Sequence, residues 1–117
     1  MEATETFILG NCVLGDGGTL PNAKIVFKTY GTLDPDRGNA ILFPTHYGGT
    51  HENNEWLIGP GKALDTDRWF VIVPNMLGNG VSSSPSNVAP PHGGASFPHV
   101  SVHDNVVLQH RLLTERF

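Results

Sequence analysis

Two short apolar runs, AILFP at residues 40–44 and WFVIVPNML at residues 69–77, constrain the fold of this chain most strongly. Both are apolar at successive positions, which is typical of strands buried on both faces in a parallel sheet covered by helices. The roughly two dozen residues between them are enough for the crossover that parallel strands require. Gly59, Pro60 and Gly61 interrupt the helical stretches of this connection, because both residue types disfavour a helix interior. We therefore expect two parallel strands joined through two short helices.

The segment before these runs predicts an antiparallel hairpin at the edge of the sheet. Residues 6–20 begin with β-prone side chains and end in a glycine-rich turn. In the following NAKIVFKTYG, Ile25, Phe27 and Thr29 alternate with positions that include Lys24 and Lys28, which is the period of a strand with one face partly in water. The two segments are expected to pair with each other.

The last third of the chain predicts a long loop followed by a helix. Residues 78–100 are dominated by Gly, Asn, Ser and Pro, and a loop of this length in a compact domain is usually functional or disordered. Ser101 stands three residues before Asp104, which indicates a capping box at a helix start. The helix is expected to run to Phe117 without a glycine stop, as if cut off there. Its predicted buried face carries Val102, Val106, Gln109 and Leu113, with Leu112 beside them.

Composition limits the classes of partner. The formal net charge is -4, and the scattered Lys and Arg residues form no basic stripe, so nucleic acid is not an expected partner. Cys12 is the only cysteine, which excludes an intrachain disulfide and a cysteine metal cluster. The start MEATETF lacks the features of a secretory signal, and no apolar run approaches the roughly 20 residues that cross a bilayer. We expect one cytoplasmic domain spanning residues 1–117, with no membrane partner.

Much of the chain resembles a known family. The segments HYGGTHENNEWLIGPGKALDTDRWFVIVPNMLGNGVSSSPSN and FPHVSVHDNVVLQHRLL resemble the N-terminal third of the homoserine O-acetyltransferase-like group of α/β-hydrolases, and LIGPGKALDTDRWFVI is the most specific part. The resemblance implies an α/β fold in which an antiparallel first hairpin is followed by parallel strands with crossover helices. It also implies that this α/β-hydrolase fold is incomplete and truncated before the nucleophile elbow. In the family's strand order, residues 39–47 would lie at an open edge of the sheet.

The resemblance further implies a serine acyl-enzyme mechanism whose triad lies beyond Phe117. No G-x-S-x-G occurs in the chain, so we expect no activity from it alone. The implied partners are a small-molecule acyl substrate and, as a co-substrate of the full-length family, acetyl-CoA or another acyl donor; no bound cofactor is expected. The turn His46–Thr50 and the loop Gly78–Val81 depart from the family's homoserine acetyltransferases, which leaves the substrate open. The alternative is a non-catalytic module or subunit that completes its sheet with a partner chain or by self-association.

The turn THYGGT carries the candidate active-site residues. In acyl-transfer enzymes of this fold, one oxyanion-hole donor is a backbone N–H in the loop after the third strand. By position, Gly48 is the best candidate, with Tyr47 and Gly49 as alternatives. The alternative interpretation is a simple tight turn that takes no part in a site. Trp56 could line an acyl pocket, although we expect Trp56 and Trp69 to pack between helix and sheet.

The other reactive side chains are not expected to form a site, and the histidines are expected to be exposed polar residues. His99, His103 and His110 lack recognised ligand spacing, so no metal site is predicted. Residues 82–84 are serines in a Ser-Ser-Ser-Pro loop that offers neither a base nor a strained position, so a flexible or pocket-lining loop is expected. Asp65, Asp67 and Arg68 are expected to cap and pair locally before the next strand.

Overall fold

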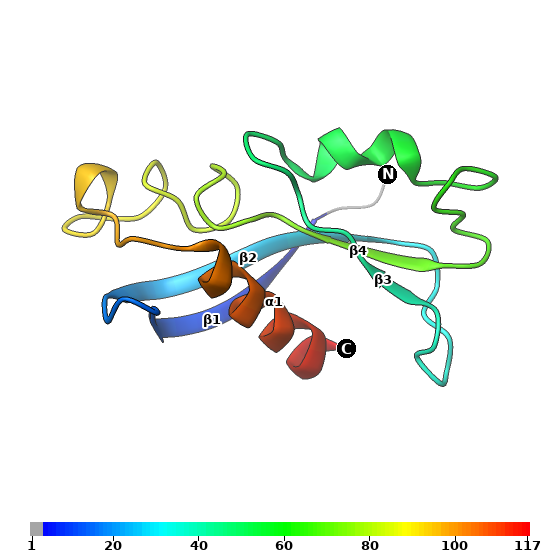
Figure 1. Cartoon of the computed structure of the whole chain (residues 1–117), viewed down its shortest axis with the longest axis horizontal. Helices are drawn as coiled ribbons and strands as arrows, with labels where there is room; N and C mark the ends of the chain where they lie inside the picture. Colours follow the sequence, from blue (N-terminus) through cyan, green and yellow to red (C-terminus); the bar gives the residue numbers. More distant parts are fainter. Residues whose placement is uncertain (1–3) are drawn as a thin grey trace.

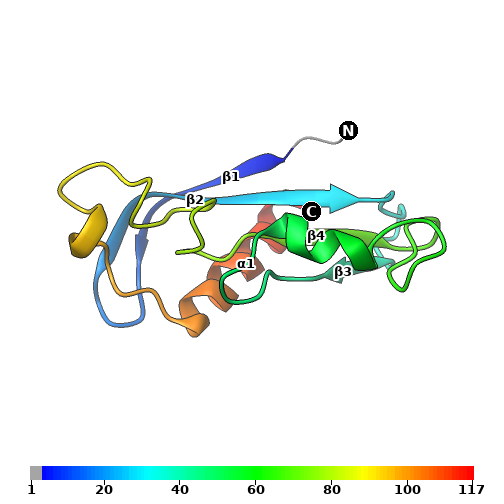
Figure 2. The same cartoon turned by 90° about the horizontal axis from the view of Figure 1, so that it is seen from above.

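Four strands form one mixed sheet in the order β1-β2-β4-β3, and the computed structural model describes residues 4–117 (Figure 1). The elements in chain order are β1 (Glu5–Val13), β2 (Thr19–Tyr30), β3 (Ala40–Leu42), the 3-10 helix η1 (His51–Leu57), β4 (Phe70–Pro74), the 3-10 helix η2 (Gly94–Ser96) and α1 (Val102–Arg116). The long helix α1 packs on one face of the sheet and η1 lies on the other (Figure 2). None of the helices in the described residues is long and apolar enough to cross a membrane.

The hairpin at the start of the chain is confirmed. β1 and β2 pair antiparallel, from Glu5 opposite Phe27 to Val13 opposite Thr19, and β1 is an edge strand. The register shifts on both sides of Gly10, whose φ of 76° suits a glycine at a bulge. Along β2 the alternate residues Ile25 and Phe27 are buried, as the sequence period predicts.

β4 is the most completely buried strand. It runs antiparallel to β2 and parallel to β3. Phe70 and Ile72 point into the core under α1, whereas Val71 and Val73 belong to a second cluster with Ile58 on the other face. The prediction that this apolar run is buried on both sides is therefore confirmed.

β3 differs from that prediction. It is short, and Ala40 is exposed while Ile41 and Leu42 are half-buried. The expectation that residues 40–44 are buried on both faces is wrong, because β3 is the outermost strand and has a neighbouring strand on one side only. Its place at an open edge is the one that the family resemblance implies.

The crossover between β3 and β4 contains one short helix, so the prediction of two is wrong. After η1 the chain forms an isolated bridge between Ile58 and Leu64 and then turns. The carbonyl of Asp65 accepts hydrogen bonds from the N–H groups of Arg68 and Trp69, at 3.1 and 2.8 Å. The residues after Gly61 are therefore used in tight turns. Arg68 stacks over the Trp69 ring at 4.7 Å and makes no ion pair with an aspartate among the described residues.

α1 starts with the capping box that the sequence predicts. The Ser101 Oγ accepts from the Asp104 N–H at 3.0 Å, and the Asp104 carboxylate accepts from the Ser101 N–H at 2.9 Å. The other Asp104 oxygen accepts from the N–H of Gly15 in the hairpin turn, at 2.8 Å. These bonds turn the Asp104 side of the helix inward, so the predicted burial of Val102 and Val106 is wrong: both are exposed. The buried residues of α1 are Asp104, Asn105, Leu108, Gln109 and Leu112.

The loop from residue 78 to residue 100 is held to the sheet by its serines. Ser82, Ser83 and Ser84 are buried. Where β2 extends beyond β4, the Lys24 and Val26 N–H groups donate to the hydroxyls of Ser83 and Ser82, each at 2.9 Å. The serine side chains thus take the place of strand partners, and Ser83 also lines a pocket beside Lys24 and Asn87, in keeping with the pocket-lining expectation.

Candidate active site

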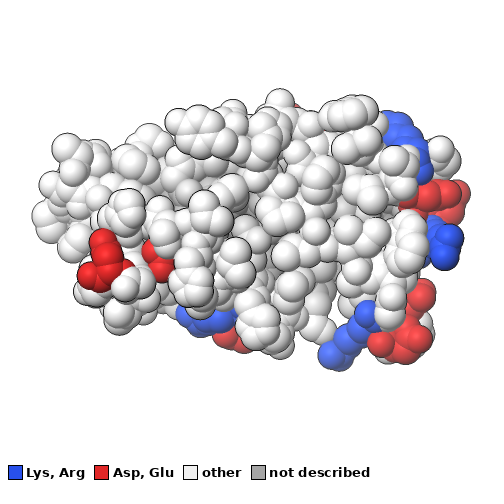
Figure 3. Space-filling model, viewed as in Figure 1, with Lys and Arg blue, Asp and Glu red and all other residues white. Residues whose placement is uncertain are grey.

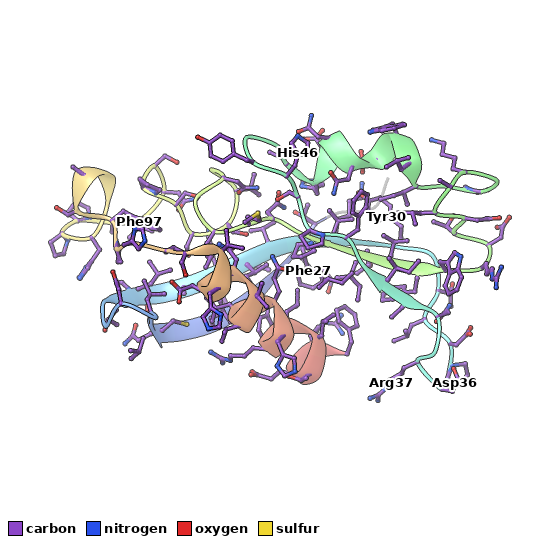
Figure 4. All side chains as sticks on the ribbon, viewed as in Figure 1. Phe27, Tyr30, Asp36, Arg37, His46 and Phe97 are labelled. Atoms are coloured by element: carbon purple, nitrogen blue, oxygen red, sulfur yellow. The ribbon has the colours of Figure 1, made fainter. Side chains whose placement is uncertain are left out.

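The turn after β3 is joined to the end of β4 through Thr45. The Thr45 N–H donates to the Pro74 carbonyl at 3.3 Å, and its buried hydroxyl accepts from the Met76 N–H at 3.1 Å. The next residues, 46–50, form a tight turn that leads into η1, with His46 at its start (Figure 4). The parallel pairing of β3 with β4 thus brings the loops that follow both strands to the same edge of the sheet.

The two glycines of this turn contribute in different ways. Gly48 has a φ of 77°, in the region that favours glycine, and a Cβ built there would meet nothing within 4 Å. Gly49 is buried, and a Cβ there would come within 2.5 Å of the His46 ring. Gly48 therefore allows the backbone to turn, while Gly49 allows the turn to close on His46.

The backbone donors of the turn are not equivalent. The Gly49 N–H donates to the His46 carbonyl at 3.0 Å and is used within the turn. The N–H groups of Tyr47 and Gly48 make no hydrogen bond within residues 4–117. The His46 N–H likewise has no partner within residues 4–117, so the amides of His46, Tyr47 and Gly48 are available to a ligand.

These amides lie beside a cavity of about 690 Å³. Its lining comes from residues 45–48, residues 76–79 after β4, residues 100–102 and Asn105 at the start of α1. The lining contains neither Gly49 nor any Lys, Arg, Asp or Glu. Figure 3 shows that the charged side chains on this side of the molecule gather toward its ends and lower margin. A lining without Lys, Arg, Asp or Glu suits a neutral ester.

Asn54, Asn75 and Asn79 connect the turn, or the residues on either side of it, to other parts of the fold, and the sequence interpretation missed all of them. Asn54 donates to the carbonyls of Phe43 and Pro44, at 3.3 and 3.2 Å. Asn75 is 1% exposed; its Oδ1 accepts from the His51 N–H at 3.0 Å and its Nδ2 donates to the Val26 carbonyl. The third is the loop residue Asn79, whose Nδ2 donates to the Gly49 carbonyl at 3.2 Å. The available signal was an asparagine directly after a buried strand, where a polar side chain needs partners.

A second set of contacts anchors η1 to the sheet. Glu55 accepts from Lys28 Nζ at 2.8 Å and from the Tyr30 hydroxyl at 2.6 Å (Figure 4). These hydrogen bonds, the one from Lys28 first, hold the pKa of the Glu55 carboxyl below its usual value. The cluster lies outside the cavity lining, so its evident effect is to hold η1, and with it the end of the turn, against β2.

The aromatic side chains near the turn are placed differently from the prediction. Trp56 is 73% exposed, so its expected packing between helix and sheet is wrong, and it does not line the cavity. Its position on the outer side of η1 is the reason, since the inner side carries the buried Asn54. Trp69 does pack against the cluster around Val71. Tyr47 lines the cavity and is fully exposed.

The three histidines at positions 99, 103 and 110, which the sequence predicts to be exposed, do not come together. His99, His103 and His110 are all exposed. Within residues 4–117, no group of three His, Cys, Asp or Glu side chains is arranged to hold a metal ion.

Comparisons with known proteins match almost the whole chain to part of longer proteins. No family model matches it. A probable esterase of Corynebacterium glutamicum is 43% identical over 117 residues, and an ethyl acetate hydrolase of Pseudomonas veronii is 41% identical over 114 residues. Each match covers 97% of this chain and 33% of the relative. A homoserine O-acetyltransferase of Clavibacter michiganensis is 37% identical over 117 residues, covering 86% of this chain and 30% of that protein.

Solved structures give the same correspondence. An acetylester hydrolase from Corynebacterium glutamicum matches with a TM-score of 0.93 and 41% identity, over 98% of this chain and 34% of that chain. A homoserine O-acetyltransferase from Bacillus anthracis matches with a TM-score of 0.83 and 31% identity, over 97% of this chain and 36% of that chain. The chain thus spans about a third of the length of the curated relatives it matches.

Proposed function

Because this chain corresponds to the N-terminal third of homoserine O-acetyltransferase-like proteins of the α/β-hydrolase superfamily, we propose that it supplies one oxyanion-hole donor to a serine-dependent acyl-transfer site. The donor is the N–H of Gly48. The observation that carries the proposal is an amide without a partner in residues 4–117, in a turn held by side chains and beside a cavity whose lining contains no Lys, Arg, Asp or Glu. Tyr47 is the alternative donor, and Gly49 is disfavoured because its N–H is already used.

The chemistry of this donor is electrostatic. When a serine attacks an acyl carbonyl, the oxygen gains negative charge, and a fixed N–H pointing at it lowers the energy of the transition state by about 3 kcal/mol. The second donor in this fold is the N–H that follows the nucleophile. No G-x-S-x-G lies within the 117 residues, so the nucleophile, its histidine and its acidic partner belong to sequence beyond them.

We propose a short acyl ester as the substrate and water as the acceptor. The support comes from the relatives, since an ethyl acetate hydrolase and an acetylester hydrolase are both at least 41% identical to this chain. Transfer from acetyl-CoA or another acyl donor is the second candidate, because a homoserine O-acetyltransferase also matches. The mechanism requires no bound cofactor in either case, and a cytoplasmic location stays a prediction.

The chain alone is proposed to be inactive and to need a C-terminal complement. β3 has a partner only in β4, so its other edge offers unpaired backbone groups to a further strand. A partner chain or a second copy is the alternative occupant of this edge. A non-catalytic module would use the same edge without the turn at residues 46–50 taking part in any reaction.

The test compares the chain with a chimera. In the chimera, this chain replaces the matched third of the Corynebacterium glutamicum esterase, with which it is 43% identical. Hydrolysis of p-nitrophenyl acetate is measured for both proteins. We expect a serine-dependent rate from the chimera and none from the chain alone. Activity of the chain alone that a serine-directed reagent abolishes, or a folded chimera without activity, contradicts the proposal.

A further inference from the structure

The side chain of Asn79 connects the loop after β4 with the turn after β3. Its Nδ2 donates to the Gly49 carbonyl at 3.2 Å and to the Oδ1 of the buried Asn75 at 3.0 Å. Its Oδ1 accepts from the N–H groups of Val81 and Ser82, at 3.0 and 3.4 Å. Both hydrogens and the oxygen of the Asn79 amide are therefore in use, so its orientation is fixed.

This contact lies one residue from the proposed oxyanion donor. Gly48 adopts a φ of 77° and has no Cβ, so no side chain of its own restricts its peptide planes. The direction of its N–H is thus set by the residues on either side. On one side, the His46 carbonyl accepts from the Gly49 N–H; on the other, the Gly49 carbonyl accepts from Asn79.

Asn79 is itself held by the buried Asn75, to whose Oδ1 it donates. Asn75 is 1% exposed and binds the Val26 carbonyl of β2 and the His51 N–H of η1. Through Asn75, Asn79 is attached to the central sheet and not only to its own loop. The turn is consequently connected, through Asn79 and Asn75, to the central strand β2.

We propose that Asn79 is a positioning residue for acyl transfer: by holding the Gly49 carbonyl, it aims the Gly48 N–H into the cavity. This inference rests on the proposed function. It predicts that Asn79 affects the transition state, in which the oxyanion exists, much more than the binding of the neutral substrate.

The test uses the chimera with Asn79→Asp and the matched control Asn87→Asp. Aspartate keeps the shape of asparagine but places an oxygen where Nδ2 faced the Gly49 carbonyl. Asn87 caps the same loop, accepting from the Ser84 N–H at 2.9 Å and donating to the Ser82 carbonyl at 2.9 Å, without touching residues 46–50. The measurements are kcat and KM for p-nitrophenyl acetate, the Kd of trifluoroacetone as a tetrahedral analogue, and the thermal midpoint.

For Asn79→Asp we expect kcat to fall about ten-fold, because a small misplacement near the reacting atoms has large effects on rate. KM should change less than about two-fold, and the Kd of trifluoroacetone should rise by about the same factor as kcat falls. Asn87→Asp should change kcat by less than about two-fold at a similar loss of thermal midpoint. If Asn79→Asp does not fold, Asn79→Ala, which adds no charge, is judged by the same criteria.

Two results overturn the inference. Equal effects of the Asn79 and Asn87 variants on kcat show that Asn79 only stabilises the loop. A rise in KM with unchanged kcat shows that it acts on substrate binding. The proposed function is tested separately by deleting the Gly48 N–H: if that deletion lowers kcat and Asn79→Asp does not, the positioning role fails while the oxyanion role stands. If the deletion has no effect, the oxyanion role itself fails.

Discussion

Deleting the N–H of Gly48 is the most direct test of the proposed site. A side-chain substitution does not remove a backbone donor, and proline, which has none, requires a φ near −65°, whereas Gly48 has 77°. Incorporating glycolic acid at position 48 replaces the N–H by an ester oxygen and leaves the shape of the turn. In the chimera, this change removes one hydrogen-bond donor and nothing else of the side-chain structure.

The size of the effect follows from the contacts of this amide. The Gly48 N–H has no hydrogen-bond partner within residues 4–117, so its removal breaks no bond of the fold. The whole loss then falls on the transition state, where one oxyanion-hole donor contributes roughly 3 kcal/mol, or 100- to 1,000-fold in kcat. KM should stay nearly constant, because the carbonyl oxygen of the free ester carries little charge.

The matched control is the same replacement at Gly61. Gly61 has a φ of 74°, open space around its Cα and no partner for its N–H in residues 4–117, but it lies in the crossover, outside the cavity lining. Steady-state hydrolysis of p-nitrophenyl acetate is measured for both. We expect the Gly61 ester to retain full kcat. A Gly48 ester that keeps kcat within about three-fold of the parent refutes the oxyanion role, since the expected loss is at least 100-fold.

The remaining predictions concern stability and assembly. Asp104→Asn should lower the free energy of unfolding of the chimera by about 1.5–3 kcal/mol at pH 7, the worth of one charge-assisted hydrogen bond. The N–H of Ser101, first among the causes, lowers the pKa of Asp104 below 3.8, so the aspartate's contribution is present above about pH 4 and is lost as the pH falls through the lowered pKa. Urea unfolding should therefore show a deficit at pH 7 that shrinks toward pH 3, and a constant deficit would contradict this. Gly31→Ala places a Cβ against the Trp69 carbonyl oxygen, so it should destabilise the chimera more than Gly61→Ala. Gly61→Ala should lower the free energy of unfolding by only about 1–2 kcal/mol, the cost of a left-handed conformation for a residue with a Cβ. Equal thermal midpoints of the two variants would refute the clash. The chain alone should associate through the open edge of β3. A monomer by light scattering that also unfolds cooperatively would favour the alternative of an independent, non-catalytic module.

The sequence predicts the parts of the fold that depend on strong local patterns. The apolar run around Val71 and Val73 has no polar alternation, and both faces of β4 are indeed buried. Ser101 and Asp104 also form the capping box that their spacing indicates. In these cases a local pattern leaves few alternatives, because periodicity and capping each satisfy groups within a few residues.

The misplaced residues depend on distant contacts. Val102 and Val106 are apolar, yet the inward face of α1 is set by Asp104, which binds Gly15 some 89 positions away. Trp56 is exposed for a similar reason, since the buried side of η1 is chosen by Asn54 and its bonds to the end of β3. In both helices buried polar side chains with specific partners outweigh the apolar pattern, because an unpaired buried polar group is costly.

The sequence predicts the position of the candidate turn but not the side chains that hold it. A Gly-Gly pair after an apolar strand marks a backbone that can approach a ligand, and Gly48 does lie beside the cavity. Asn75 carries only the signal of a polar residue directly after a buried strand, and Asn79 lies in a loop rich in Gly and Ser, where an asparagine reads as an ordinary turn former. Their partners, His51 and Gly49, lie 24 and 30 positions away.

The serines that bind β2 also determine where the sheet has backbone groups open to pairing with another strand. β2 continues past the end of β4, and its Lys24 and Val26 amides would otherwise face outward, ready to pair with a foreign strand. The hydroxyls of Ser82 and Ser83 occupy these donors with groups that cannot themselves be extended into a further strand. On that side of the sheet, the short β3 is the strand that remains open to backbone pairing, so a strand added there is expected to pair with β3.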